Sequence, residues 1–346
     1  MRYATASTLA AAIITMSACS TAPEAVQVDA AKLKLFRPLP AVMESASNPV
    51  TEEKVTLGRM LYFEKRLSKG HDISCNSCHN LTSYGVDNQP TSEGHKGQKG
   101  TRNSPTVYNA AGHFVQFWDG RAKDVEEQAK GPVLNPVEMA MPNEKHVLAV
   151  LNSIPEYVEM FKKAFPEDKN PVTYDNAAKA IGAFERKLVT PARWDKFLQG
   201  DAAALTDAEK TGFNKFTQLG CQTCHSGVYL GGSTFQKIGS VMPYTSQQDL
   251  GRFAVTKQDA DKFMFKVPSL RDVEKTAPYY HDGSVATLEE AVSSMANLQL
   301  GKQLTREDTA SIVTFLKSLT GDLPSEYIQP PELPKSTAKT PKPDRS

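Results

Sequence analysis

The sequence predicts an all-α protein in which two similar domains are built from helices and long loops. Three observations lead to this prediction: apolar residues recur at helical spacing, one short motif occurs twice, and one longer segment repeats without gaps. A chain of 346 residues is long enough for about two domains. Alternating apolar and polar segments are not evident, so we expect no regular sheet.

Two segments of the first half have the pattern of helices. Residues 51–64 begin with acidic residues, as the first turn of a helix commonly does. Residues 173–188 carry one apolar face, which is formed by Ala177, Ile181, Phe184 and Leu188. Residues 80–104 and 226–266 are longer than ordinary connections, and loops of that length are commonly functional.

Capping residues place further helices in the second half. Thr206 and Glu209 have the spacing of a capping box, which opens a helix that we expect to end at Gly220. Thr287 begins a second pattern of this kind, and residues 311–319 lie in a last amphipathic helix.

Four of the five cysteines lie in two copies of the motif Cys-x-x-Cys-His. The copies consist of Cys75, Cys78 and His79, and of Cys221, Cys224 and His225. This pattern is typical of c-type haem attachment, in which two sulfurs form thioethers with the haem and the His binds its iron. The sequence therefore predicts two covalently bound haem c groups, each wrapped by the long loops of one cytochrome-c-like domain.

Other uses of these cysteines explain the pattern less well. A zinc site would need the two Cys pairs about 15–20 residues apart, whereas Cys78 and Cys221 are far apart in the chain. A thioredoxin-like pair does not require the following His, which occurs both times. Disulfide frameworks are typical of short, cysteine-rich secreted chains, and this chain is neither short nor rich in cysteine.

The repeat extends beyond the haem motifs. Residues 105–127 align without gaps on residues 268–290 at a constant offset. The identical pairs are Pro105 with Pro268, Asp119 with Asp282, Gly120 with Gly283, Glu126 with Glu289 and Glu127 with Glu290. The simplest interpretation is an internal duplication, with two domains built on one plan.

These observations divide the chain into five parts. Residues 1–18 are interpreted as a signal peptide and residues 19–50 as a linker or extension. Residues 51–195 and 196–325 form the N-terminal and C-terminal cytochrome-c-like domains. Residues 326–346 are rich in Pro, Lys, Thr and Ser, so we expect a disordered tail.

The N-terminal segment predicts export. Arg2 precedes a short apolar run, residues 9–16, which cannot span a bilayer and has the form of a signal peptide. Small residues then lead to Cys19, which resembles a bacterial lipoprotein box with Cys19 as the lipidated first residue. Ordinary cleavage after Ala18 is the alternative. In both cases we expect a periplasmic protein, free or anchored to the membrane through Cys19.

The charge of the chain excludes some partners. The formal net charge is +1, from 40 basic and 39 acidic residues. No basic field therefore indicates a nucleic-acid partner, and no polybasic run indicates a lipid headgroup surface.

The ligand on the second face of the first iron must come from elsewhere in the chain. His71 lies only four residues before Cys75, so it could hardly reach over the haem to its opposite face. His146 lies inside a predicted helix and is interpreted as an ordinary helix residue. His95 lies in a glycine-rich loop that can approach a haem closely and can rearrange. His113 and the absence of any second ligand remain alternatives.

For the second iron a Met is the favoured ligand, because Met/His ligation raises the potential of a haem. The candidates are Met242, Met264 and Met295. Met295 falls on the apolar face of the helix after Thr287, so a purely structural role in the core is the alternative.

Taken together, the residues resemble a known family, the bacterial dihaem cytochrome c peroxidases, over about residues 57–319. The segments that carry the resemblance are residues 57–63, 73–79, 102–106, 116–121, 136–139 and 276–283. The resemblance implies reduction of hydrogen peroxide with electrons from a small cytochrome c or cupredoxin, and a homodimer.

The resemblance also implies roles for particular residues. His95 matches the detachable ligand of a low-potential, peroxidatic haem in the N-terminal domain. Met295 matches the ligand of a high-potential, electron-transfer haem in the C-terminal domain. Trp118 matches an aromatic residue between the haems. Gln128 and Glu138 match the polar residues of the peroxide pocket, with Glu138 as the general acid–base group.

A calcium site is implied in the same way, by Asn103 and the carbonyl groups of Thr276 and Pro278. Two other functions remain open from the sequence. One is a dihaem electron-transfer cytochrome with both irons permanently six-coordinate. The other is a dihaem oxidase of a protein side chain, related to tryptophylquinone-maturation enzymes, which have Tyr where this chain has Met295.

Overall fold

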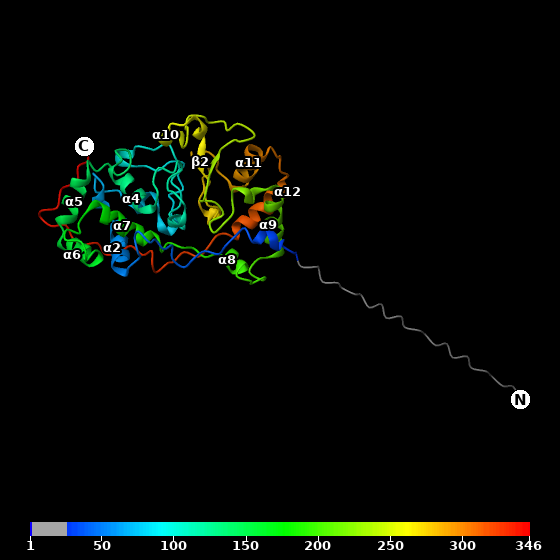
Figure 1. The fold of residues 1–346 in the computed structure, drawn as a ribbon, viewed down its shortest axis with the longest axis horizontal. Coiled ribbons are helices and arrows are strands. Elements are labelled where there is room, and N and C mark those ends of the chain that lie inside the picture. Colours follow the sequence, from blue (N-terminus) through cyan, green and yellow to red (C-terminus); the bar gives the residue numbers. More distant parts are fainter. Residues whose placement is uncertain (2–25) are drawn as a thin grey trace.

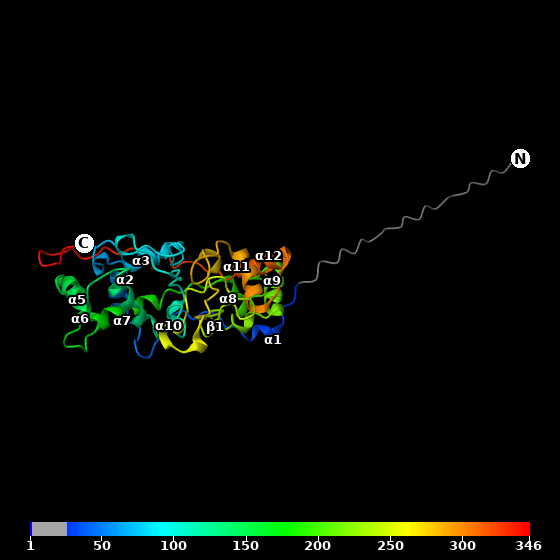
Figure 2. The same ribbon diagram turned by 90° about the horizontal axis from the view of Figure 1, so that it is seen from above.

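The computed structural model describes residue 1 and residues 26–346 (Figure 1). The predicted signal peptide and Cys19 therefore lie outside the described residues. The described part is elongated, with helices gathered at both ends and loops in the middle (Figures 1 and 2). Within it, none of the helices has the length and apolar character needed to cross a membrane.

The N-terminal domain is helical, as predicted. Its helices are α2 (Glu52–Tyr62), α3 (Cys75–Cys78), α4 (Val125–Leu134), α5 (Glu144–Asn152), α6 (Pro155–Ala164) and α7 (Tyr174–Glu185). Thr51 and Thr173 cap α2 and α7 by accepting hydrogen bonds from the third backbone N–H of each helix. Helix α2 packs against α7, and their apolar faces form much of the first core.

The C-terminal domain has a second set of helices. They are α8 (Arg193–Leu198), α9 (Asp207–Leu219), α10 (Phe253–Thr256), α11 (Leu288–Leu300) and α12 (Arg306–Lys317). The predicted capping box is present at α9, where Thr206 and Glu209 exchange hydrogen bonds. The helix ends at Gly220, whose φ of 101° is left-handed.

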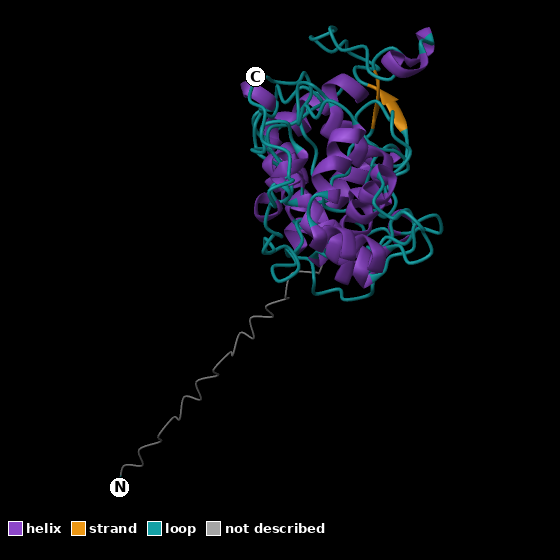
Figure 3. Ribbon diagram, turned by 90° about the vertical axis from the view of Figure 1, so that its left-hand side faces the viewer, coloured by secondary structure: helices purple, strands orange, loops and turns teal. Residues whose placement is uncertain are grey.

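The expectation of no regular sheet needs one correction. Strands β1 (Phe235–Lys237) and β2 (Met264–Lys266) form an antiparallel ribbon in which Phe235 lies opposite Lys266. In Figure 3 the ribbon lies at the edge of the helical body. Each strand has three residues, which is too short for an alternating pattern to be recognised in the sequence.

Two equivalent helix pairs organise the two domains. Helix α9 packs against α12 in the second core as α2 packs against α7 in the first. A glycine lies at each crossing, Gly58 in α2 and Gly212 in α9. A Cβ atom at Gly58 would overlap the carbonyl oxygen of Ala180, and one at Gly212 would overlap that of Ser311. Glycine at these positions allows the helix backbones to approach closely.

The repeated segments adopt matching backbone conformations. Asn109 and Asp272 occupy equivalent repeat positions, and both have a left-handed backbone, with φ of 61° and 59°. Phe117 and Tyr280 are likewise equivalent, with φ of 65° and 72°. Helices α4 and α11 begin at the same position of the repeat. The sequence repeat is therefore also a repeat of local structure.

Residues 26–50, the described part of the segment 19–50 that was expected to be a linker or extension, pack against both domains. Helix α1 (Ala30–Leu33) leads to Phe36, which is 2% exposed and packs in the second core against the rings of Trp194 and Phe213. The chain then reaches the first domain, where Asn48 donates a hydrogen bond to the Glu126 carboxylate. Trp194 of α8 also belongs to this second core, although it lies just before the predicted boundary at 195/196.

Residues 326–346, expected to be a disordered tail, make specific contacts with the N-terminal domain. After α12 the chain runs back along the N-terminal domain (Figure 1). Tyr327 stacks on Phe184 with ring centroids 5.0 Å apart, and Ile328 is buried in the first core. Farther along, the Asp344 N–H donates to the Lys69 carbonyl. Two apolar anchors and scattered hydrogen bonds hold this tail, and a composition-based prediction takes no account of them.

The helix crossing at Gly212 gives a test of the fold. We expect Gly212→Ala to lower the free energy of unfolding by about 1–3 kcal/mol, because the new methyl group must push α9 away from α12. The measurement is urea unfolding followed by far-UV circular dichroism. Gly100→Ala is the matched control, because a Cβ at Gly100 meets no atom within 4 Å. Equal stabilities of the two variants would contradict the close-approach argument.

Candidate dihaem site

The first haem motif lies on a single helical turn. Helix α3 carries Cys75 and Cys78, and the His79 N–H closes the turn on the Cys75 carbonyl at 2.9 Å. Both sulfurs and the imidazole therefore come from one short segment, as thioether attachment requires. Burial lowers the pKa of His79, so its ring is neutral and can offer a nitrogen lone pair to iron.

The second motif has the same local form. Its 3₁₀ turn, Cys221–Thr223, follows α9, and the His225 N–H donates to the Cys221 carbonyl at 3.0 Å. The other side of the His225 ring is fixed, because Nδ1–H donates to the Leu230 carbonyl at 3.0 Å. This bond leaves Nε2 as the free acceptor, which is the arrangement typical of a metal-binding His.

A cavity of about 480 Å³ adjoins the second motif, and we call it the C-terminal cavity. Cys221, Cys224 and His225 lie on its wall together with Met295 from α11. The remaining lining is mostly apolar. A large apolar cavity that carries two thiols, an imidazole and a thioether fits a covalently held haem with His and Met ligands. Met242, the alternative ligand, is 46% exposed, and Met264 lies in β2 outside this lining.

His95 is buried in the N-terminal domain. It begins the 3₁₀ turn His95–Gly97 and is 7% exposed, and its Nε2 has no hydrogen-bond partner among the residues that the structure describes. The His95 N–H donates to the Glu138 carbonyl at 2.8 Å. Gly94 permits this contact, because a Cβ there would overlap the Val137 carbonyl. A buried ring nitrogen without a partner fits an iron ligand.

Glu138 lies beside the first haem motif. Its Oε1 accepts a hydrogen bond from Asn135 Nδ2 at 2.7 Å. Burial raises the pKa of Glu138, which the charge of Arg121 partly offsets. Burial also raises the pKa of the Cys78 thiol to about 11, with a contribution from the Glu138 charge. Gln128 lies half-buried on α4 and is not hydrogen-bonded to Glu138.

Trp118 lies at the junction of the two domains. Its indole N–H donates to the Asn103 carbonyl at 2.9 Å, within the N-terminal domain. Its own carbonyl accepts a hydrogen bond from the Lys266 N–H at 2.7 Å, across to the C-terminal domain. The side chain lies on the wall of the C-terminal cavity. Trp118 therefore has fixed contacts with both domains.

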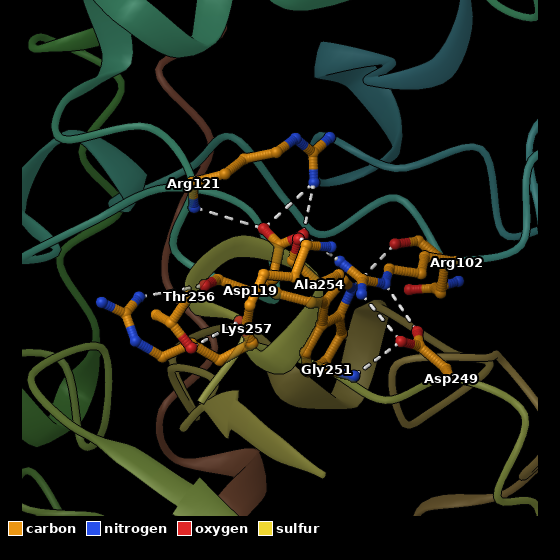
Figure 4. Close-up of polar contacts among 11 residues, drawn as sticks. Arg102, Asp119, Arg121, Asp249, Gly251, Ala254, Thr256 and Lys257 are labelled. Carbon is orange, nitrogen blue, oxygen red and sulfur yellow. Dashed lines mark hydrogen bonds and ion pairs between the residues drawn. The ribbon is translucent and has the colours of Figure 1, made fainter. Parts of the chain in front are cut away.

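An ion-pair network reinforces this junction (Figure 4). Arg102 donates to Asp119 at 2.6 Å and, through two nitrogens, to Asp249 of the C-terminal domain at 2.6 and 2.8 Å. Arg121 pairs with the same Asp119 carboxylate. Arg102 and Asp249 are each 19% exposed in their side chains, and a paired guanidinium of this kind adds geometric specificity.

The three residues expected at a calcium site, Asn103, Thr276 and Pro278, all line the C-terminal cavity. The Asn103 amide nitrogen donates to the Gln89 carbonyl at 3.0 Å, so its Oδ1 is the atom left for a cation. Amide and carbonyl oxygens are ligands that calcium accepts.

Comparison with known proteins identifies the family. A model of the family described as di-haem cytochrome c peroxidase matches residues 52–203. The cytochrome c551 peroxidase of Pseudomonas aeruginosa is 49% identical over 318 residues, covering 89% of this chain and 90% of that protein. The chain belongs to the di-haem cytochrome c peroxidase family.

Other members support this assignment. The cytochrome c551 peroxidase of Nitrosomonas europaea is 48% identical and covers 86% of this chain and 88% of its own. The crystal structure of a MauG-like protein associated with microbial copper homeostasis superposes with a TM-score of 0.75. The MauG-like protein is 30% identical in sequence, and the match covers 85% of this chain and 97% of the MauG-like chain. The predicted family, the mostly helical fold and the two haem c cofactors are thus confirmed.

Sequence analysis of this di-haem peroxidase missed the residues that join its domains. Asp249 pairs with Arg102 across the junction, but neither the spacing nor the neighbours of Asp249 indicate a long-range partner. Lys266 is 6% exposed and lies on the wall of the C-terminal cavity. Its position between Phe265 and Val267 is a weak sign of a specific role for Lys266. A single Lys between apolar residues is more easily explained by a buried contact than by solubility.

Proposed function

We propose that this di-haem peroxidase reduces hydrogen peroxide to water in the periplasm, with electrons from a small cytochrome c or cupredoxin. The names of its relatives, cytochrome c551 peroxidases, support the reaction class and a cytochrome donor. The observation that carries the proposal is the inequality of the two haem sites. One has its candidate second ligand on a loop, and the other has it on a helix.

The C-terminal site is suited to electron transfer. Met295 lies in the middle of α11, a helix of 13 residues, and shares the C-terminal cavity with His225. A ligand on a packed helix cannot leave without displacing the helix. A permanent His/Met pair would keep this site closed to substrate and its potential high. Met295 also disfavours the protein-oxidising enzymes that have Tyr at this position.

The N-terminal site is suited to chemistry, because its candidate ligand can leave. When bound, haem c supplies an iron that can bind peroxide and exchange electrons. The His95 loop is held by the His95–Glu138 backbone bond and by the Gly94 N–H bond to the Gln98 carbonyl, both 2.8 Å. Gln98 adds a side-chain bond to the Pro136 carbonyl at 3.3 Å. Release of these few bonds would withdraw His95 and open the site.

Glu138 is the group that would move a proton. The Asn135 amide fixes Oε1, so Oε2 is available to take a proton from one peroxide oxygen and deliver it to the other. Burial raises the pKa of Glu138 toward neutral pH. Proton transfer by a side chain is most efficient when its pKa lies near the working pH. Gln128 would add a second polar group to this pocket. Trp118 would connect the two sites at the junction.

Further features belong to the same proposal. A calcium ion held by Asn103 Oδ1 and the carbonyl oxygens of Thr276 and Pro278 would fix the two domains relative to each other. The matching backbone repeats support an internal duplication in which the loops wrap both haems. Cys19 would carry a lipid anchor, and two copies of the chain would form a homodimer.

The role of Glu138 gives a direct test. We expect Glu138→Gln to lower kcat for peroxide about 10²–10⁴-fold, because Gln cannot carry the proton between the two oxygens. The measurement is steady-state oxidation of reduced cytochrome c, with both haems counted by their absorption spectra. Glu167→Gln, an exposed carboxylate of the same domain, is the control. A variant at Glu138 with undiminished kcat and full haem content would remove Glu138 from the mechanism.

The mobile-ligand role of His95 gives a second test. We expect His95→Gly to turn over peroxide from the fully oxidised state, whereas the unmodified protein should first require reduction of the C-terminal haem. Stopped-flow mixing with peroxide, with and without prior reduction, measures the difference. His146→Ala serves as control, since His146 is exposed on α5. If His95→Gly still required prior reduction, another residue would control access to the iron.

A further inference from the structure

Lys266 is a buried cation without an acidic partner. It is 6% exposed, and its Nζ contacts only neutral groups, His113 Nδ1 at 3.3 Å and the Val115 carbonyl at 3.2 Å. No carboxylate of the described chain lies within ion-pair distance of it. The other cation on the wall of the C-terminal cavity, Arg271, is paired with Asp195 at 2.7 Å. Lys266 thus lacks the counter-charge that a buried cation normally has.

Beside Lys266, the ring of His113 has an N–H group that donates to no other described residue. Because Nδ1 accepts a hydrogen bond from the Lys266 ammonium, the ring proton belongs on Nε2. That Nε2 is buried and has no partner among the described residues. Tyr229 packs edge-on against the ring with centroids 5.2 Å apart, which holds it in place. A buried donor left without a partner is destabilising, so this pair is arranged to receive an acceptor.

Both side chains line the C-terminal cavity, and they come from different domains. His113 belongs to the N-terminal domain, and Lys266 is tied to Trp118 at the junction. The cavity reaches from there to Cys221, which packs against the C-terminal core. The thioether bonds of haem c lie at its vinyl edge, and its two propionates lie at the opposite edge. The junction is therefore the part of the cavity suited to a carboxylate.

We propose that Lys266 and His113 bind a propionate carboxylate of the haem that Cys221 and Cys224 hold. The ammonium supplies the counter-charge, and the imidazole N–H supplies a directed hydrogen bond. Burial lowers the pKa of Lys266 to about 8, and a bound carboxylate would raise it and keep the cation charged. The N-terminal domain would then take part in holding the haem of the C-terminal domain. This inference rests on the proposed dihaem function.

Resonance Raman spectroscopy of the purified dihaem protein tests the inference, because the propionate-bending bands report hydrogen bonding to the carboxylates. We expect Lys266→Met to shift these bands for the C-terminal haem only, and to lower its reduction potential relative to the unmodified protein. His113→Phe should shift the same bands while keeping the Lys266 charge. Lys237→Gln, an exposed Lys on the paired strand β1, should leave bands and potential unchanged.

The outcomes separate this inference from the proposed function. Unshifted bands in both variants, with two haems bound, would overturn it, as would a shift confined to the N-terminal haem. A potential that depends on chloride, with unshifted bands, would assign the pair to a free anion and also overturn it. If Lys266→Met does not fold, the result for His113→Phe decides. Fewer than two haems in the unmodified protein would instead contradict the proposed function.

Discussion

The hydrogen bond from the Lys266 N–H to the Trp118 carbonyl, 2.7 Å long, is the contact on which the arrangement of the two sites depends. It joins strand β2 of the C-terminal domain to the segment of the N-terminal domain that carries Trp118. The indole is fixed from its own side by the Asn103 carbonyl. One side chain is therefore positioned by both domains, at the wall of the cavity that would hold the second haem. Electron exchange between two haems needs a constant distance between them, and contacts that hold Trp118 from both domains would keep that distance constant.

The surrounding structure limits motion at the junction. Arg102 connects Asp119 and Asp249 across it, with little exposure of any of the three side chains. The two ends of the described chain also bind across the domains, through Phe36 in the second core and Ile328 in the first. Rigid domains leave the His95 loop, with its few backbone bonds, as the natural place for a conformational change. The proposed assignment of peroxide chemistry to the N-terminal site and electron transfer to the C-terminal site rests on this difference.

Local features were predictable from the sequence, and long-range partners were not. Thr206 with Glu209 indicated where α9 begins, because a capping box acts within four residues. The haem motifs and the repeat likewise needed only neighbouring residues. The Arg102–Asp249 pair, the β1–β2 ribbon and the packing of Tyr327 on Phe184 depend on residues distant in the chain. The segments that carry these contacts have the composition of ordinary loops. For the same reason, residues 326–346 were predicted to be a disordered tail.

We infer that the two haem sites are unequal, with a ligand that can leave only in the N-terminal domain. A redox titration of the full protein, followed by electron paramagnetic resonance, tests this inequality. After uptake of one electron per molecule, we expect the N-terminal haem to change from low spin to high spin and then to bind added peroxide. A half-reduced protein whose oxidised haem stays low-spin and does not react with peroxide would show that neither ligand leaves and would indicate an electron carrier.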